Sequence, residues 1–181
     1  MEEIEVKILE INQYFIENEL QKLGAHKIFF GEIYDIFYDF PNGNIRNQED
    51  VLRLRKEGEE TIFGYKKHLA QGEAKVMEEW ETLVSDLENM KTILTKLGLE
   101  VIQESRKFRT EYLFGDTKVV IDDYQDALDH IPVFMEVEAP TVEEMYKVVK
   151  LLGYEAKDCL SWNTYDLAKH YEQNNPTSPS S

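Results

Sequence analysis

The chain has 181 residues, with 36 Asp and Glu against 20 Lys and Arg, which gives a formal net charge of -16. This length suits one hydrophobic core, so we expect a single domain over residues 1–172. The acidic excess argues against nucleic acid or an anionic membrane as the main partner. An anionic ligand would therefore need basic residues concentrated in one place.

Cysteine use and the charged N-terminal stretch favour a cytoplasmic protein. Cys159 is the single cysteine, so no internal disulfide forms, and charges occupy the N-terminal stretch where a signal peptide needs an apolar run. No apolar stretch approaches the roughly 18 residues of a membrane-spanning helix. Residues 173–181 are mostly Asn, Pro and Ser, and we expect them to form a disordered tail.

The first predicted element is a strand at residues 3–8. Glu3, Glu5 and Lys7 alternate there with aliphatic residues. Because alternate residues of a strand point to the same side, these three charges share one face. Glu136 and Glu138 repeat the alternation near the far end. Such a face is either solvated or binds a charged ligand.

Helices are predicted near residues 12–23, 86–97, 141–152 and 163–172. The first two end in Leu-Gly, at Gly24 and Gly98, and glycine accepts the left-handed backbone that often ends a helix. The offset, 98 − 24 = 74, also maps Glu5 onto Glu79. This predicts two similar halves, although the glycines alone fit unrelated helix ends equally well.

Strands are predicted at residues 51–55, 61–68 and 75–83, and a hairpin at residues 108–124. Each strand has an apolar face that needs cover. A closed barrel with a polar interior and helices packed outside provides that cover better than a sandwich with an open charged face.

The charges on the polar faces include both acids and bases. For a single strand a solvated outer face is the commoner explanation, by roughly three to one, but here the pattern recurs on every strand. A polyphosphate with a divalent cation needs both kinds of residue, since Arg and Lys bind phosphate oxygens and carboxylates bind the cation. The residues are Glu3, Glu5, Lys7, Arg53, Arg55, Lys66, Lys75, Glu79, Glu81, Lys107, Arg109, Asp122, Glu136 and Glu138.

Other phosphate and metal motifs are missing from the sequence. It has neither a Gly-x-x-x-x-Gly-Lys-Ser/Thr loop nor a Gly-x-Gly-x-x-Gly turn after a strand. The four histidines lack zinc-site spacing, and Cys159 has no second cysteine beside it. Magnesium or manganese bound by carboxylate oxygens therefore fits better than zinc or thiol chemistry.

The charged residues also occur in a recognisable order: Glu3-x-Glu5-x-Lys7, Arg53-x-Arg55, Lys66, Lys107-x-Arg109, Asp122 and Glu136-x-Glu138. From Glu3 to about Tyr171 this order resembles the CYTH, or triphosphate tunnel metalloenzyme, superfamily. The resemblance implies an α+β fold: a closed eight-stranded antiparallel β-barrel (tunnel) with helices packed on the outside. Its lumen would bind a triphosphate and one or two divalent cations.

The resemblance also implies a role for each charged residue. The acids on the metal side, which would bind Mg2+ or Mn2+, are Glu3, Glu5, Asp122, Glu136 and Glu138. The bases that would bind the triphosphate are Lys7, Arg53, Arg55, Lys66, Lys75, Lys107 and Arg109. Lys66, Glu79 and Glu81 are the candidate catalytic residues, the two glutamates supporting either the metal or the bases.

Some positions depart from the family pattern. Phe37 stands where tyrosine is common, and in triphosphatases that tyrosine is thought to help activate water. Met77 replaces a frequent arginine, for which Lys75 could substitute. Trp162 stands where tyrosine is usual, and the neighbouring Ser161 suits a helix N-cap at least as well as a family role.

The expected chemistry is phosphoryl or nucleotidyl transfer on ATP or tripolyphosphate. The short chain and Phe37 favour a class IV adenylyl cyclase, which converts ATP to cyclic AMP and pyrophosphate. One alternative is an inorganic, nucleoside or thiamine triphosphatase, and another is a non-catalytic binder of nucleotides or polyphosphate. The sequence is compatible with a monomer or a homodimer.

Overall fold

The computed structural model describes residues 2–71 and 74–174, in which eight strands and four α-helices occur. The strands are β1 (Glu2–Ile8), β2 (His26–Asp39), β3 (Val51–Glu57), β4 (Glu60–Gln71), β5 (Lys75–Leu83), β6 (Glu100–Phe114), β7 (Thr117–Gln125) and β8 (Phe134–Ala139). The helices are α1 (Gln13–Lys22), α2 (Leu87–Lys96), α3 (Val142–Leu151) and α4 (Thr164–Asn174).

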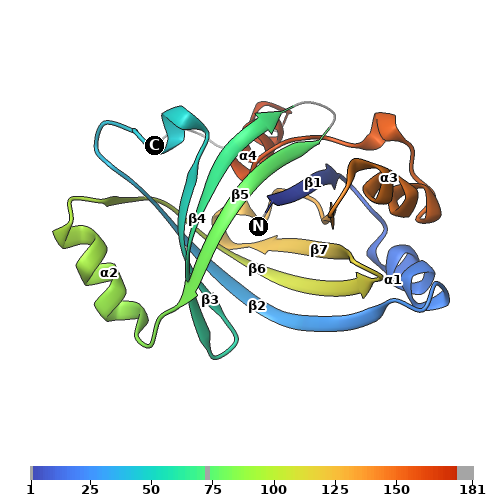
Figure 1. Ribbon diagram of the computed structural model, residues 1–181, viewed down its shortest axis with the longest axis horizontal. Helices are drawn as coiled ribbons and strands as arrows, with labels where there is room; N and C mark the ends of the chain where they lie inside the picture. The colour runs from blue at the N-terminus through green and yellow to red at the C-terminus, as the bar shows by residue number, and fades with distance from the viewer. Residues whose placement is uncertain (1, 72–73, 175–181) are drawn as a thin grey trace.

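The strands close into one antiparallel barrel with the order β1-β5-β4-β3-β2-β6-β7-β8, completed by the pairing of β1 with β8. In Figure 1, α1 and α3 lie together on one side of the barrel and α2 lies on the other. The predicted closed eight-stranded barrel with helices outside is confirmed.

The barrel consists of two similar halves, β1 to β4 and β5 to β8. The first strands of the halves pair with each other, as do their second strands, β2 and β6. Glu3 lies opposite Met77 in one pairing and Ile33 opposite Lys107 in the other, and both separations, 77 − 3 and 107 − 33, equal the 74-residue offset found in the sequence. The two halves are thus related by an approximate twofold arrangement.

The apolar core lies between the barrel wall and the helices. Val6, Val137 and Ile121 on the outer face of β1, β8 and β7 pack with Ile16 of α1 and Val148 of α3. On the other side, outward residues of β2 and β3 pack against α2. Each fully buried aliphatic side chain contributes about 1.5–3 kcal/mol relative to exposure. Since the core is outside the wall, the inward faces are free to carry charge.

Side-chain caps fix the helix starts close to the predicted positions. Asn12, Asp86 and Thr141 each accept a hydrogen bond from the backbone N–H three residues later. Helix α4 is capped by Asn163, which accepts from the Asp166 N–H at 2.9 Å, so Ser161 is not the N-cap.

The C-terminal helix extends beyond the predicted domain end at residue 172. Helix α4 continues to Asn174 and so includes the first two residues of the expected tail. Residues 175–181 lie outside the described part of the chain. Within the described part, every helix is too short or too polar to cross a membrane.

Candidate active site

The inward residues line a cavity of about 1020 Å³ inside the barrel. Twelve of the predicted site residues line it: Glu5, Lys7, Arg53, Arg55, Lys66, Lys75, Glu79, Glu81, Lys107, Arg109, Glu136 and Glu138. Asp122 lies behind this lining and is fully buried. Glu3 belongs to β1 by its backbone, but its side chain lies outside the described atoms.

Three carboxylates meet on the wall formed by β1 and β8. Glu5 lies directly opposite Glu138, and Glu136 is on the same face of β8 two residues earlier. Glu5, Glu136 and Glu138 each place one oxygen within 4.8 Å of the others. Buried like charges repel one another, so this arrangement needs cations beside it. The all-oxygen donor set fits the hard cations Mg2+ and Mn2+.

A lysine contacts each of these acids. Lys7 Nζ lies 2.6 Å from Glu136 Oε1, Lys75 Nζ lies 3.3 Å from Glu5 Oε1, and Lys118 Nζ lies 2.6 Å from Glu138 Oε2. Burial alone would lower the pKa of Lys7, but Glu136 and Glu5 outweigh it and raise that pKa. Burial likewise opposes the charge on Glu136, yet Lys7 and Arg109 hold its pKa well below the usual range. Both partners are therefore ionised.

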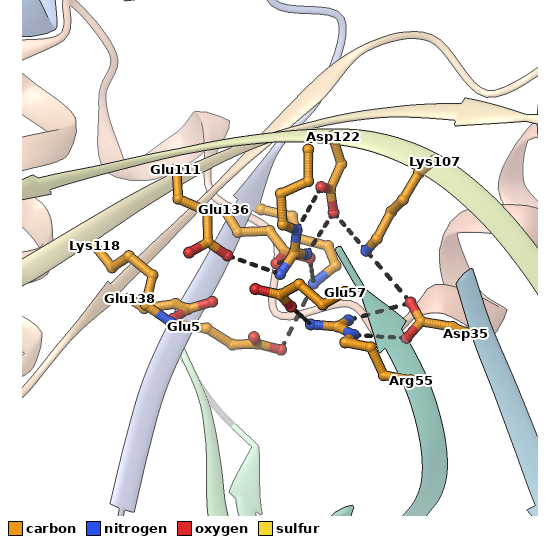
Figure 2. A network of polar contacts seen from close by, with 12 residues as sticks. Glu5, Asp35, Arg55, Glu57, Lys107, Glu111, Lys118, Asp122, Glu136 and Glu138 are labelled. Carbon is orange, nitrogen blue, oxygen red and sulfur yellow. Dashed lines mark hydrogen bonds and ion pairs between the residues drawn. The ribbon is translucent and has the colours of Figure 1, made fainter. Parts of the chain in front are cut away.

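Asp122 holds two of the bases in position from behind. Its carboxylate accepts two hydrogen bonds from Arg109, at 2.7 and 2.6 Å. It also accepts one from Lys107 at 2.7 Å (Figure 2). Burial would raise the pKa of Asp122, but Arg109 and Lys107 lower it. Arg109 also reaches Glu136 Oε2 at 3.4 Å. The carboxylate of Asp122 thus contacts bases, and Asp122 is not in the three-acid cluster.

Asp35 plays the same part for Arg55. Arg55 donates to both oxygens of Asp35, at 2.7 and 3.1 Å, and Asp35 is 1% exposed. Figure 2 shows these side chains directed at the same space as Lys107. Burial opposes the charge of Asp35, but Arg55 and Arg53 hold its pKa far below normal. The bases predicted to bind the triphosphate, which we call the phosphate clamp, thus include three that buried acids hold in place: Arg55, Lys107 and Arg109.

Glu79 and Glu81 on β5 contact bases on β4 and β3. Glu79 lies 3.1 Å from Lys66, and Glu81 lies 3.0 Å from Arg53. Gly64 separates Arg53 from Glu81 in the strand register and leaves the space that this contact uses. Of the two roles predicted for Glu79 and Glu81, support of the basic side chains agrees with these contacts.

Sequence reasoning missed several residues of the cavity. Asp35 lies two residues before Phe37 on β2, and Lys118 lies four residues before Asp122 on β7, so both share an inward face with those residues. The strand alternation in the sequence could therefore have identified them. Gln103 lines the cavity without carrying charge, so a search for charged faces passes over it. Tyr165 and Lys169 of α4 also line the cavity, but no local pattern places that helix at the barrel.

Comparisons with known proteins agree with this geometry. The chain is 28% identical over 174 residues to a Methanocaldococcus jannaschii protein provisionally named an adenylate cyclase, covering 91% of this chain and 97% of that protein. Among solved structures, a provisionally named adenylate cyclase from Vibrio parahaemolyticus has a TM-score of 0.79 at 20% identity, covering 92% and 97% of the two chains.

A second similar structure comes from Hippeastrum. This provisional adenylyl cyclase, described as having a dominant triphosphatase activity, has a TM-score of 0.66 at 14% identity and covers 93% of this chain and 95% of that one. The CYTH domain family matches residues 1–159. This match, with the closed barrel and its charged interior, confirms the resemblance read from the sequence. The chain belongs to the CYTH domain family.

Proposed function

We propose that this protein is a metal-dependent enzyme acting on a triphosphate inside the barrel, and that it converts ATP to cyclic AMP and pyrophosphate. One observation carries the proposal: Glu5, Glu136 and Glu138 gather within 4.8 Å of one another in the same cavity as a set of buried bases. A divalent cation and a polyphosphate need these two groups side by side.

The residues would divide the work between cation and phosphates. The three clustered acids would hold Mg2+ or Mn2+, which when bound withdraws charge from phosphate oxygens. Arg55 and Arg109, already fixed by Asp35 and Asp122, would bind phosphate oxygens without further ordering. Such preorganised positive charge is an effective way to stabilise a phosphoryl-transfer transition state.

Lys66, Glu79 and Glu81 remain our candidates for a direct catalytic part. Lys66 faces the cavity 3.1 Å from Glu79 and would bind a phosphate oxygen. Glu81 borders Arg53, so its carboxylate would accept the proton of the attacking ribose 3′-hydroxyl close to the bound phosphates. The new O–P bond forms at the α-phosphorus as the bond to pyrophosphate breaks.

The alternative reaction is hydrolysis of the terminal phosphate. The Hippeastrum protein described by its triphosphatase activity makes this the second candidate. Phe37 favours the cyclase, because its side chain lines the cavity and has no hydroxyl to position a water.

A product assay separates these reactions. Purified protein is incubated with ATP and Mg2+ or Mn2+, and nucleotides and phosphates are resolved by chromatography. We expect cyclic AMP and pyrophosphate in equal amounts, abolished by EDTA. Orthophosphate without cyclic AMP would establish the triphosphatase instead. If ATP remains intact and the protein binds tripolyphosphate tightly, the protein is a non-catalytic binder.

A further inference from the structure

One part of the cavity wall has the character of a nucleobase site and not of a phosphate site. Phe37 on β2 and Gln103 on β6 lie directly opposite each other, and both line the cavity. Ile102, next to Gln103, lines it too. This part of the wall thus consists of an aromatic ring, an aliphatic side chain and a neutral amide, and it lies beside the phosphate clamp. Phosphate oxygens gain nothing from the ring or the aliphatic side chain, whereas a heterocyclic base packs against both and pairs with the amide.

Gln103 has an unused hydrogen-bond donor. Its Nε2 is buried and makes no hydrogen bond with any residue of the described segments. A buried amide without a partner is destabilising, and native structures rarely keep one without a reason. Because Gln103 lines the cavity, a rotation of its amide would turn this donor toward a ligand there, which would supply the missing partner.

The register places this pair beside the phosphate clamp. Phe37 lies opposite Gln103 on one side and opposite Arg53 on the other. The same row continues through Gly64 to Glu81, which contacts Arg53 at 3.0 Å. A base against Phe37 would therefore have its ribose near Arg53 and Glu81, with the phosphates toward the remaining bases. The cavity of about 1020 Å³ is at the upper end of those that hold whole small-molecule ligands.

We propose that Phe37 and Gln103 form a nucleobase subsite that selects adenine. This inference rests on the proposed function and specifies the substrate class as an adenine nucleoside triphosphate. A glutamine amide pairs with adenine through two hydrogen bonds, because it donates to a ring nitrogen and accepts from the exocyclic amine. Guanine presents two acceptors on the corresponding edge and leaves the glutamine oxygen unpaired. Phe37 supplies the face on which the base stacks.

Binding of ATP, GTP and tripolyphosphate by calorimetry in EDTA tests the subsite without turnover. We expect wild-type protein to bind ATP about tenfold more tightly than GTP, in keeping with one bidentate base contact. Phe37→Ala should weaken ATP binding about tenfold, as expected for a lost stacking contact, and leave tripolyphosphate binding unchanged. Phe37→Leu, which keeps the apolar volume, should have the same effect if the ring face matters.

Gln103→Ala should bring the affinities for ATP and GTP together without altering that for tripolyphosphate. The controls are Phe30→Ala, on the same strand but 68% exposed outside the cavity, and Gln21→Ala on α1, both with wild-type affinities.

Two results would overturn the subsite. Either Phe37 and Gln103 variants change ATP and tripolyphosphate binding equally, or wild-type protein binds ATP and GTP with the same affinity. In both cases the wild-type protein still binds tripolyphosphate, so the proposed triphosphate site is retained. Failure of wild-type protein to bind tripolyphosphate both in EDTA and with Mg2+ present would refute the proposed function together with the subsite.

Discussion

Glu5 and Glu138 lie directly opposite each other on β1 and β8, so two carboxylates meet at this point of the wall. By the 74-residue offset, the counterpart of Glu5 is Glu79 on β5, which lies opposite Lys66 on β4. Glu79 thus faces a lysine across its strand pair, whereas Glu5 faces a second carboxylate and has its nearest lysine, Lys75, on the other neighbouring strand at 3.3 Å. This difference accounts for the acid cluster occurring on the β1 and β8 wall.

Glu138→Gln should weaken binding of the divalent cation. The substitution keeps the shape of the side chain but removes one of the three negative charges proposed to hold the cation, so we expect the Mn2+ concentration for half-maximal activity to rise about tenfold or more. Glu100→Gln, on an exposed side chain of β6, serves as the control. An unchanged Mn2+ requirement with lost stability would make Glu138 a structural partner of Lys118 only.

Arg55→Ala should destabilise the fold as well as weaken triphosphate binding. Asp35 is 1% exposed, and removing its main partner leaves a buried carboxylate poorly compensated, at a cost of about 3–5 kcal/mol. Asp35→Asn together with Arg55→Ala should cost less than the sum of the single changes, by up to about 3 kcal/mol in urea unfolding.

An exposed pair on β6 and β2 provides the comparison. Arg106 and Glu32 lie 3.2 Å apart on β6 and β2, with side chains 44% and 53% exposed. Arg106→Ala should lower the free energy of unfolding by less than about 1 kcal/mol. Equal losses for Arg55→Ala and Arg106→Ala would contradict a structural role for the buried pair.

The free energy of unfolding should fall as the pH is lowered from about 5 to 2. Glu136 and Asp35 have folded pKa values below their unfolded values of about 4.3 and 3.9, so the unfolded chain binds more protons in this range. Their contribution is complete above the unfolded pKa and disappears as the folded pKa is passed. Urea unfolding at several pH values measures it, and Glu136→Gln should flatten the curve whereas Glu100→Gln should not.

Asp39→Ala should loosen the loop between β2 and β3. The buried Asp39 carboxylate accepts hydrogen bonds from the backbone N–H groups of Phe40, Ile45 and Arg46, at 2.7, 2.9 and 3.0 Å. Leaving these donors without a partner should cost about 1–3 kcal/mol. Limited proteolysis should then cut within residues 40–50. Asp116→Ala, at the exposed β6–β7 turn, should leave both stability and cleavage unchanged.

Much of the barrel could be predicted from the sequence because strand alternation is a local signal. Glu5, Lys7, Glu136 and Glu138 follow a period of two, which fixes their common face once the strands close. The Leu-Gly helix ends are also a local pattern. The 74-residue offset between them is an internal repeat of the sequence, and the same offset relates paired residues of the two halves of the barrel.

Which inward acids form the cluster and which ones bind bases could not be predicted in the same way. Asp122 and Glu136 are both inward carboxylates, yet only Glu136 joins the acid cluster. Asp122 accepts bonds from Arg109 because the β6–β7 register sets those two residues opposite each other. Cross-strand register depends on loop lengths and bulges along the chain, and periodicity alone does not specify it.

The pairing of the first strand with the last has a consequence for how the chain folds. Glu5 meets Glu138 across 138 − 5 = 133 residues, so β1 lacks one of its two neighbours until β8 has been synthesised. Contacts of such large sequence separation slow folding because a long loop must close before they form. During translation the nascent N-terminal strand would therefore spend seconds with an open edge, a state in which a chaperone could shield it.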